Sequence, residues 1–237
     1  MSYKIDNAII MAAGMSSRFG PIALECPKAL LEVKGEVLIE RQIRQLMAAG
    51  VPQIVIVVGY MKEKFEYLQE KYGAILVENP DYAVRNNHSS IYAAREYLKN
   101  SYVCSADNYF SVNPFQIKEA EAFYAAIYVE GRTKEWCITV DDNEYIKKVV
   151  IGGDNAWIML GHTFWSEKFS EKFLEILKCN YDTERIKTQL WESIYLDNIA
   201  VLRMKIKKYS ADEIHEFDSL EELQEFDKTY QYDYKNK

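Results

Sequence analysis

The sequence predicts an α/β fold with a mixed, mostly parallel β-sheet that gains antiparallel strands after about residue 120. Before that point, short apolar runs alternate with segments of helical periodicity, the order expected of parallel strands joined by right-handed crossovers. After it, apolar segments follow one another with links of hairpin length. No linker, repeat or low-complexity tract interrupts the chain, so we expect a single domain over residues 1–237.

The first half of the chain is expected to alternate strands and helices. The strands are short apolar runs at residues 8–11, 53–60, 74–77 and 102–105. Two helices, over residues 37–49 and 62–72, carry apolar residues at three- and four-residue spacing and end at Gly50 and Gly73. A third helix is expected to begin near Ser89 or Ser90, either of which can cap its first turn.

The second half is expected to add hairpins and then further helices. The segments expected to form four strands are FYAAIYVEG, EWCITVDD, YIKKVVIGG and AWIMLGHTFW. Helices at residues 166–178 and 184–197 then precede a strand in RMKIKKY. The last element expected is a helix in FDSLEELQEF, opened by Asp218 or Ser219.

The composition is that of a globular protein and excludes several classes of function. The net charge is −7 and no stripe of basic residues occurs, so we expect no nucleic-acid partner. No apolar run has membrane-spanning length and no signal-peptide pattern opens the chain, so a cytoplasmic protein without membrane contact is expected. The 4 cysteines and 3 histidines lack zinc-site spacing, and the cysteines are expected to be buried, reduced thiols.

The loop after the first strand has the composition of an anion-binding loop. The small residues of AAGMSSRFGP let backbone N–H groups approach a ligand closely, and the cation Lys28 follows. The spacing around Gly14 fits neither the Walker A pattern nor the Rossmann dinucleotide pattern. Ligands of a doubly wound sheet bind at the carboxyl ends of its strands. The residues expected on that rim are Gly14, Gly59, Asn87 and Asp107.

This loop and the segment after it resemble the signature of the nucleotidyltransferases that make nucleotide-activated sugars and alcohols. The usual pattern is A-A-G-x-G-x-R-x-x-P followed by P-K-x-L, and the chain departs from it at Ser16, where glycine is usual, and at Cys26, where threonine often stands. The matching positions are Ala12, Ala13, Gly14, Arg18, Pro21, Pro27, Lys28 and Leu30. Five segments resemble bacterial CTP:phosphocholine cytidylyltransferases in particular. They are IVIVVGY, NPDYAVRNNHSSIY, SYVCSADNYF, TKEWCITVDD and IHEFDSLEEL. The resemblance implies a Rossmann-like, three-layer nucleotidyltransferase fold.

The resemblance also implies a reaction, in which CTP and phosphocholine give CDP-choline and pyrophosphate with the help of Mg²⁺. An acceptor phosphate is largely dianionic at neutral pH, so no general base is needed. A cytidylyltransferase for 2-aminoethylphosphonate, a sugar-1-phosphate nucleotidyltransferase and a nucleotide-sensing domain without turnover remain alternatives. The residues do not distinguish cytosine from other bases. We expect small-molecule substrates and a monomer or homodimer.

Each part of this reaction has candidate residues. Lys28 is expected to neutralise the α-phosphate and Arg18 the β- and γ-phosphates. The resemblance assigns Mg²⁺ to Asp107 and Asp218, and Asp218 is also placed to cap a helix. Candidates for binding the nucleotide are Ala12, Ala13, Gly14, Met15, Ser16, Asn87, Ser90 and Ala106. Candidates for binding the amino-alcohol, through aromatic faces and a carboxylate, are Trp136, Tyr128, Trp191 and Glu216.

Overall fold

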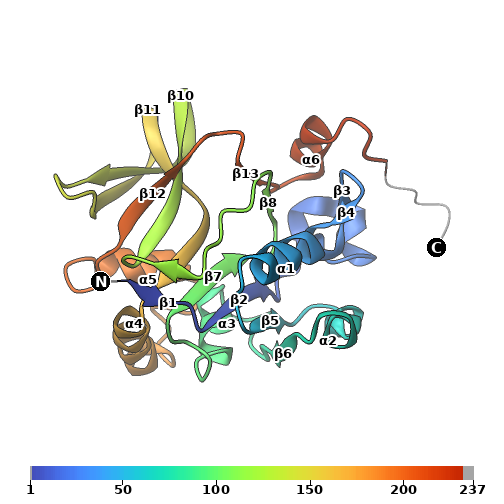
Figure 1. The fold of residues 1–237 in the computed structure, drawn as a ribbon, viewed down its shortest axis with the longest axis horizontal. Coiled ribbons are helices and arrows are strands. Elements are labelled where there is room, and N and C mark those ends of the chain that lie inside the picture. Colours follow the sequence, from blue (N-terminus) through green and yellow to red (C-terminus); the bar gives the residue numbers. More distant parts are fainter. Residues whose placement is uncertain (1, 232–237) are drawn as a thin grey trace.

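The computed structural model describes residues 2–231 and is built on a seven-stranded sheet of order β12-β10-β11-β7-β2-β5-β6 (Figure 1). Strands β7, β2, β5 and β6 run parallel, and β11 joins them antiparallel to β7. The strands of the sheet are β2 (Asn7–Ala12), β5 (Ile54–Val58), β6 (Ile75–Glu78), β7 (Ser101–Ser105), β10 (Phe123–Val140), β11 (Ile146–Trp165) and β12 (Lys205–Tyr209). Three short antiparallel pairs are β1 (Tyr3–Lys4) with β9 (Lys118–Glu119), β3 (Glu32–Val33) with β4 (Glu36–Val37), and β8 (Asn108–Phe110) with β13 (Ile214–Glu216).

Helices cover both faces of the sheet, which gives the three layers expected from the sequence. The α-helices are α1 (Leu38–Ala48), α2 (Tyr67–Tyr72), α3 (His88–Ala93), α4 (Glu167–Asn180), α5 (Trp191–Asp197) and α6 (Leu220–Phe226). The 3₁₀ turns are η1 (Ser17–Leu24), η2 (Lys28–Leu30) and η3 (Lys62–Phe65). Because side chains of a strand alternate between faces, Ile10 of β2 packs with α1 and α2, whereas Ile9 packs with α3, α4 and α5. The predicted mixed, mostly parallel α/β fold is confirmed.

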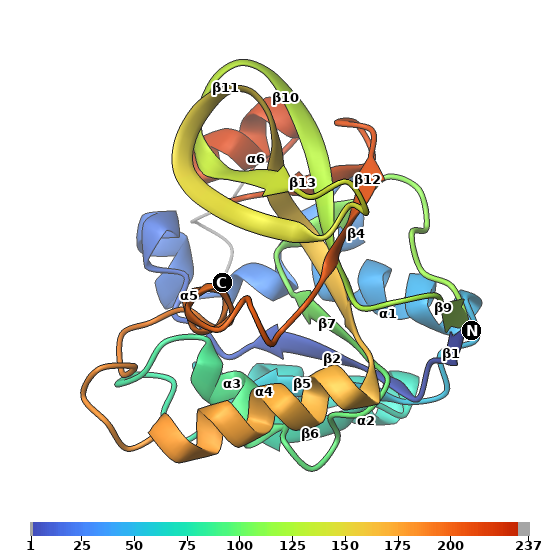
Figure 2. The same ribbon diagram turned by 90° about the vertical axis from the view of Figure 1, so that its left-hand side faces the viewer.

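Strands β10 and β11 are the main departure from the elements expected. The sequence predicted four strands here, but the structure has two long ones that curl over the sheet (Figure 2). Cys137 pairs with both Val150 and Ile158, so the ribbon bends back far enough to contact itself. Gly131 and Gly152 adopt left-handed φ values of 76° and 80°, which bend the strands at bulges without ending them.

Helix α3 begins earlier than predicted and is not capped by a serine side chain. It starts at His88, so both Ser89 and Ser90 lie inside it. Their hydroxyl oxygens instead accept hydrogen bonds of 2.8 Å and 3.2 Å from Asn79 Nδ2, at the end of β6. The serines therefore join α3 to the neighbouring strand end.

The helix expected at residues 184–197 is present only from Trp191 onward. The residues before it form turns whose carbonyl groups contact the segment around the start of α3. The backbone N–H of Asn86 donates to the carbonyl of Lys187, and its side-chain amide donates to that of Thr188. His88 Nδ1 lies 2.8 Å from the carbonyl of Gln189. These contacts replace the helical hydrogen bonds and tie the segment to the start of α3.

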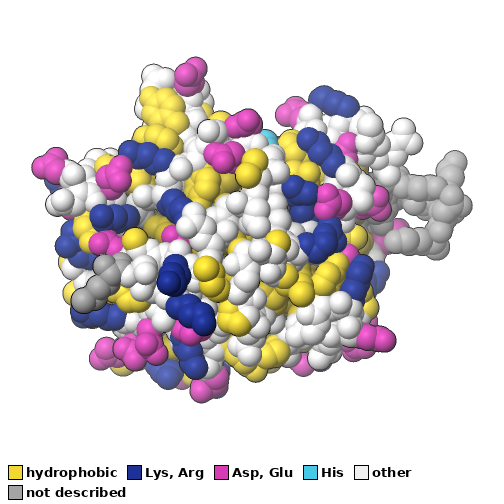
Figure 3. All heavy atoms as spheres, viewed as in Figure 1, with side chains coloured by type: hydrophobic (Ala, Val, Ile, Leu, Met, Phe, Trp, Pro, Cys, Tyr) yellow, Lys and Arg dark blue, Asp and Glu magenta, His cyan; other side chains and the backbone are white. Residues whose placement is uncertain are grey.

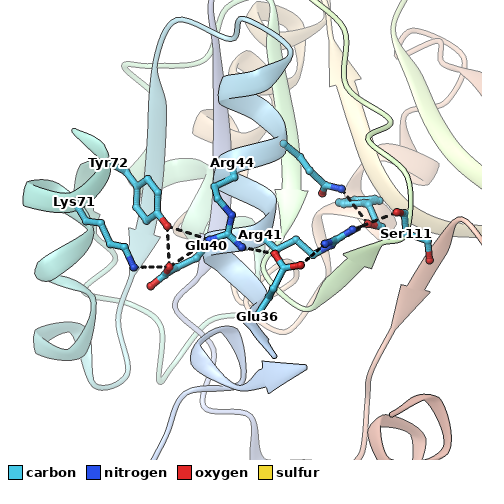
Figure 4. A network of polar contacts seen from close by, with 9 residues as sticks. Glu36, Glu40, Arg41, Arg44, Lys71, Tyr72 and Ser111 are labelled. Carbon is cyan, nitrogen blue, oxygen red and sulfur yellow. Dashed lines mark hydrogen bonds and ion pairs between the residues drawn. The ribbon is translucent and has the colours of Figure 1, made fainter. Parts of the chain in front are cut away.

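A polar network fixes α1 to the elements on either side of it (Figure 4). On one side, the buried carboxylate of Glu40 accepts hydrogen bonds of 2.7 Å each from Lys71 Nζ and Tyr72 OH. Burial alone would raise the pKa of Glu40, but these bonds and one from Tyr67 together hold it below its ordinary value. On the other side, Arg41 donates to the carbonyl of Phe110 in β8, which pairs with β13. The network thus reaches the strand that ends at Glu216.

The surface mixes both signs of charge on the face drawn in Figure 3, where Lys and Arg side chains alternate with Asp and Glu. Among the described residues, no helix is both long and apolar enough to span a membrane. The four cysteines are not in disulfide bonds, and Cys104 and Cys137 are buried as expected. The expectation is wrong for Cys179, which is exposed near the end of α4, and Cys26 is only half-buried.

Candidate active site

The loop that follows β2 is held in place by Ser16. Its φ of 52° lies in the left-handed region that favours glycine. The hydroxyl oxygen of Ser16 accepts a 3.2 Å hydrogen bond from the backbone N–H of Lys28, a contact that a glycine could not make. The departure from the usual glycine therefore has a structural role, because this bond fixes where η2 begins.

Lys28 lies at the centre of a charged cluster. Its Nζ is 2.7 Å from Asp107 Oδ2 and 3.8 Å from Asp218 Oδ1, and it donates a 2.6 Å hydrogen bond to the carbonyl of Phe217. The side chain of Lys28 is only 14% exposed. Arg18 Nη1 lies 2.6 Å from Asp218 Oδ2, but the arginine side chain is 70% exposed. The two predicted phosphate-binding cations thus share one carboxylate.

Three carboxylates gather at the same point. Asp107, Glu216 and Asp218 each offer an oxygen that lies within 4.8 Å of the other two. Burial, together with the charges of Asp107 and Asp218, raises the pKa of Glu216 to about 8. Among the described residues, the buried Oδ1 of Asp107 has no hydrogen-bond partner. Clustered carboxylates with a free oxygen fit a divalent cation such as Mg²⁺. The sequence placed Glu216 with the amino-alcohol, whereas its nearest carboxylate neighbours are the predicted metal ligands.

Ser219, and not Asp218, caps the last helix. The hydroxyl oxygen of Ser219 accepts a 3.2 Å hydrogen bond from the backbone N–H of Glu222. In return, the Glu222 carboxylate accepts a 2.7 Å hydrogen bond from the backbone N–H of Asp218. The carboxylate of Asp218 is therefore not used as the helix cap and lies in the charged cluster.

A cavity of about 580 Å³ lies beside this cluster, at the carboxyl ends of the parallel strands. Predicted site residues in its wall are Arg18, Ala13, Gly14, Asn87, Ser90, Asp107, Trp136, Glu216 and Asp218. A smaller pocket of about 90 Å³, which shares Gly14 and Asp107 with it, is lined by Ala12, Ser16, Lys28 and Ala106. Met15 lines neither space and is exposed. A Cβ added to Gly14 would meet no protein atom within 4 Å, so this glycine leaves open space in the wall.

The side-chain amide of Asn87 has two partners on α5 and keeps one N–H and one oxygen lone pair for a ligand. Its Nδ2 donates a 3.1 Å hydrogen bond to Glu192 Oε2, and its Oδ1 accepts a 2.7 Å hydrogen bond from the backbone N–H of Trp191. The amide thus binds the first turn of α5. That this amide contacts a pyrimidine edge stays a prediction. Ser90 lies in the cavity wall, where Asn79 and Ser89 accompany it.

Two of the aromatic residues proposed to surround the amino-alcohol do not reach the cavity. Trp191 is 1% exposed and packs in the core between Trp165 and Tyr195, because the apolar face of α5 turns toward the sheet. Tyr128 lies on β10 outside the cavity, with its ring edge against Trp157. The prediction is wrong for both, and Trp136 is the one of the three tryptophan and tyrosine candidates that lines the cavity.

Several residues of the wall were missed by the sequence analysis, among them a carboxylate and two tyrosines. Glu192 enters from α5, Tyr124 from β10, and Tyr82 from the loop after β6. The ring of Tyr82 lies so close to Gly59 that a Cβ there would stand 2.7 Å from the ring. That glycine was expected on the rim and proves to support a wall residue instead. Glu192 sits next to Trp191 in a segment expected to be one long helix, so no local signal marked it.

Comparison with known proteins places the chain in a family. Residues 8–117 match the family model of the MobA-like NTP transferase domain. The chain is 35% identical over 221 residues to the choline-phosphate cytidylyltransferase of Streptococcus pneumoniae. The aligned region covers 93% of this chain and 96% of that protein. The chain belongs to the nucleotidyltransferase family. This nucleotidyltransferase is also 36% identical over 230 residues to the 2-aminoethylphosphonate cytidylyltransferase of Lancefieldella rimae, covering 95% of this chain and 94% of that protein.

A solved structure extends the similarity to three dimensions. The CTP:phosphocholine cytidylyltransferase from Streptococcus pneumoniae matches this nucleotidyltransferase with a TM-score of 0.90 and 34% identity, over 95% of this chain and 99% of that chain. The resemblance stated from the sequence is confirmed, as are the nucleotidyltransferase fold and the enzyme class that it implied.

Proposed function

We propose that this enzyme transfers the cytidylyl group of CTP to phosphocholine, which gives CDP-choline and pyrophosphate. The observation that carries the proposal is the meeting of Lys28 with three carboxylates at the wall of a cavity that also contains Trp136. The cluster supplies the groups that a nucleoside triphosphate and a divalent cation need. The tryptophan supplies an aromatic face for a quaternary ammonium group. The relatives that act on choline phosphate support the same acceptor.

The reaction is an in-line displacement at the α-phosphorus of CTP. An oxygen of the acceptor phosphate attacks, the bond from the α-phosphorus to the pyrophosphate oxygen breaks, and pyrophosphate leaves with that electron pair. The attacking phosphate is already ionised near neutral pH, so the site needs no general base. Lys28 binds the α-phosphate and neutralises its developing charge, and Arg18 holds the leaving pyrophosphate. Positioning and charge neutralisation supply the rate enhancement.

Asp107 and Asp218 are the residues that would hold Mg²⁺, with Glu216 beside them. When bound, Mg²⁺ would neutralise phosphate charge and align the reacting groups. Without a nucleotide, Lys28 and Arg18 form ion pairs with Asp107 and Asp218 and so offset their negative charges. On binding CTP, these two cations are expected to turn toward its phosphates.

A second acceptor, 2-aminoethylphosphonate, is favoured by a specific feature of the cavity. Tyr128 and Trp191 are not among the aromatic residues of the wall, while Glu192 joins Glu216 there. Carboxylates accept hydrogen bonds from a primary ammonium group, which loses its hydration in a site without acceptors. The relative that acts on 2-aminoethylphosphonate is as similar as the choline enzyme.

The experiment that tests the proposal measures pyrophosphate release for each of four nucleoside triphosphates against three acceptors. The acceptors are phosphocholine, 2-aminoethylphosphonate and glucose 1-phosphate. We expect the highest kcat/KM for CTP with phosphocholine and negligible release with the sugar phosphate. Much faster turnover of 2-aminoethylphosphonate at saturating CTP would assign the second acceptor. A preference for UTP and the sugar phosphate would contradict both.

A further inference from the structure

Glu192 presents its carboxylate to the active-site cavity from the first turn of α5. Its Oε2 accepts a 3.1 Å hydrogen bond from Asn87 Nδ2, and its Oε1 accepts a weaker one of 3.4 Å from Tyr124 OH. Each carboxylate oxygen has a second lone pair, so both retain the capacity to accept from a ligand.

The two donors are themselves fixed by the residue before Glu192. Asn87 Oδ1 accepts a 2.7 Å hydrogen bond from the backbone N–H of Trp191. The ring of Tyr124 stacks on the indole of Trp191, with centroids 5.7 Å apart and planes 14° from parallel. Trp191 is buried in the core, so the whole arrangement rests on packed side chains. Glu192 is therefore a preorganised carboxylate and not a freely rotating surface group.

Among the described residues, the carboxylate of Glu192 lacks the ion pairs that Asp107 and Asp218 have. Asp107 and Asp218 have Lys28 and Arg18 as ion-pair partners. Among the described residues, no Lys, Arg or His nitrogen lies within 4.0 Å of Glu192. The other cation of the cavity wall, Arg85, donates to the carbonyl of Tyr181.

Burial makes this isolation costly for the ionised form. Burial raises the pKa of Glu192 to about 7, although the hydrogen bonds from Asn87 and Tyr124 act to lower this pKa. A cationic ligand beside the carboxylate would return it to the ionised state and offset its lost hydration. Among the described residues, Glu192 is thus a carboxylate of the cavity wall without an ion pair, whereas Lys28 and Arg18 lie with the acidic cluster beside it.

We propose that Glu192 binds the ammonium group of the acceptor, and that Asn87 and Tyr124 are positioning residues that hold its carboxylate for this contact. The inference rests on the proposed cytidylyltransferase function and names the acceptor class: a phosphate or phosphonate that carries an ammonium group. Its anionic end meets Lys28 while its cationic end meets Glu192 and the face of Trp136. A neutral sugar phosphate lacks the cation that Glu192 requires.

The test compares Glu192→Gln with the unchanged enzyme on two acceptors of the same shape. These are phosphocholine and 3,3-dimethylbutyl phosphate, in which a neutral carbon replaces the ammonium nitrogen. We expect kcat/KM for phosphocholine to fall about 30-fold, equivalent to about 2 kcal/mol, mainly through KM. The kcat/KM for the neutral acceptor and the KM for CTP should change less than about threefold, because neither the neutral acceptor nor CTP binds through the charge of Glu192. Glu171→Gln, an exposed change on α4, is the matched control.

Two further variants separate binding from positioning. Glu192→Asp keeps the charge on a shorter side chain and should recover part of the preference for phosphocholine. Tyr124→Phe keeps the stacked ring but loses the hydroxyl, and should raise the KM for phosphocholine about threefold with kcat nearly unchanged. The melting temperature of each variant checks that the fold is intact.

The outcomes distinguish this inference from the function on which it rests. Equal losses on both acceptors, or no loss on either, in a folded Glu192→Gln enzyme would overturn the role of Glu192 and leave cytidylyl transfer standing. Absence of any CDP-linked product from the unchanged enzyme with ammonium-bearing acceptors would overturn both. If 2-aminoethylphosphonate is the better acceptor, a selective loss on that substrate supports the same role.

Discussion

Replacing Lys28 with methionine tests the chemistry assigned to the charged cluster. The change keeps most of the side-chain length but removes the ammonium group that lies 2.7 Å from Asp107 and 3.8 Å from Asp218. Removing one charge partner of a transition state costs about 10²- to 10³-fold in kcat. Since Lys28 is only 14% exposed, water cannot replace it fully, and we expect the fall in kcat to lie within that range.

The assay is pyrophosphate release at saturating CTP, Mg²⁺ and acceptor, with Lys172→Met as the control because this exposed lysine on α4 does not line the cavity. Folding is checked by the melting temperature, which should stay within a few degrees of that of the unchanged enzyme. The carboxylates of Asp107, Glu216 and Asp218 are partly exposed and can be hydrated or protonated when the lysine charge is lost. A folded Lys28→Met enzyme with near-normal kcat would refute the assignment of Lys28 to the transition state.

Three further predictions concern the loop, the last helix and the polar network of α1. Gly14→Ala should raise the KM for CTP on the order of tenfold at unchanged melting temperature, since a Cβ there meets no protein atom; an unchanged KM would show that no ligand approaches it. Asp218→Asn should raise the Mg²⁺ concentration needed for half-maximal rate. Ser219→Ala should leave that concentration unchanged but lower the free energy of unfolding in urea by about 1 kcal/mol, and the reverse pattern would exchange the roles of the two residues. Glu40→Gln should lower the free energy of unfolding by about 1–2 kcal/mol at pH 7. Because the folded-state pKa of Glu40 is lowered, that difference should vanish as the pH falls below about 4, and a difference that persists there would contradict the ion-pair account.

The parallel half of the fold could be predicted because its signals are local. Strands β2, β5, β6 and β7 are short apolar runs, and helices α1 and α2 between them have their own periodicity. The rule that ligands bind at strand ends then brought Asp107 and the loop around Gly14 together before any coordinates were considered. The cation that joins them, Lys28, was marked by its place after the small-residue loop and again by the family pattern.

The rest depended on contacts between distant segments, which no local pattern encodes. Links of hairpin length suggested that the ribbon of β10 and β11 would be four strands, but Gly131 and Gly152 bend strands that continue past them. Trp191 was expected in the cavity because aromatic residues suit a cation, yet the packing of α5 buries it and turns Glu192 outward. Only the folded chain shows that Asn87 is bound to that helix.

Isotope labelling of the acceptor tests the central claim most directly, that an acceptor phosphate oxygen attacks the α-phosphorus of CTP. Phosphocholine labelled with ¹⁸O at its non-bridging oxygens is converted with unlabelled CTP, and the products are analysed by ³¹P NMR. Attack at the α-phosphorus predicts CDP-choline with ¹⁸O in the bridge between its two phosphorus atoms, together with unlabelled pyrophosphate. An unlabelled bridge, label in the pyrophosphate, or no CDP-choline would contradict the account.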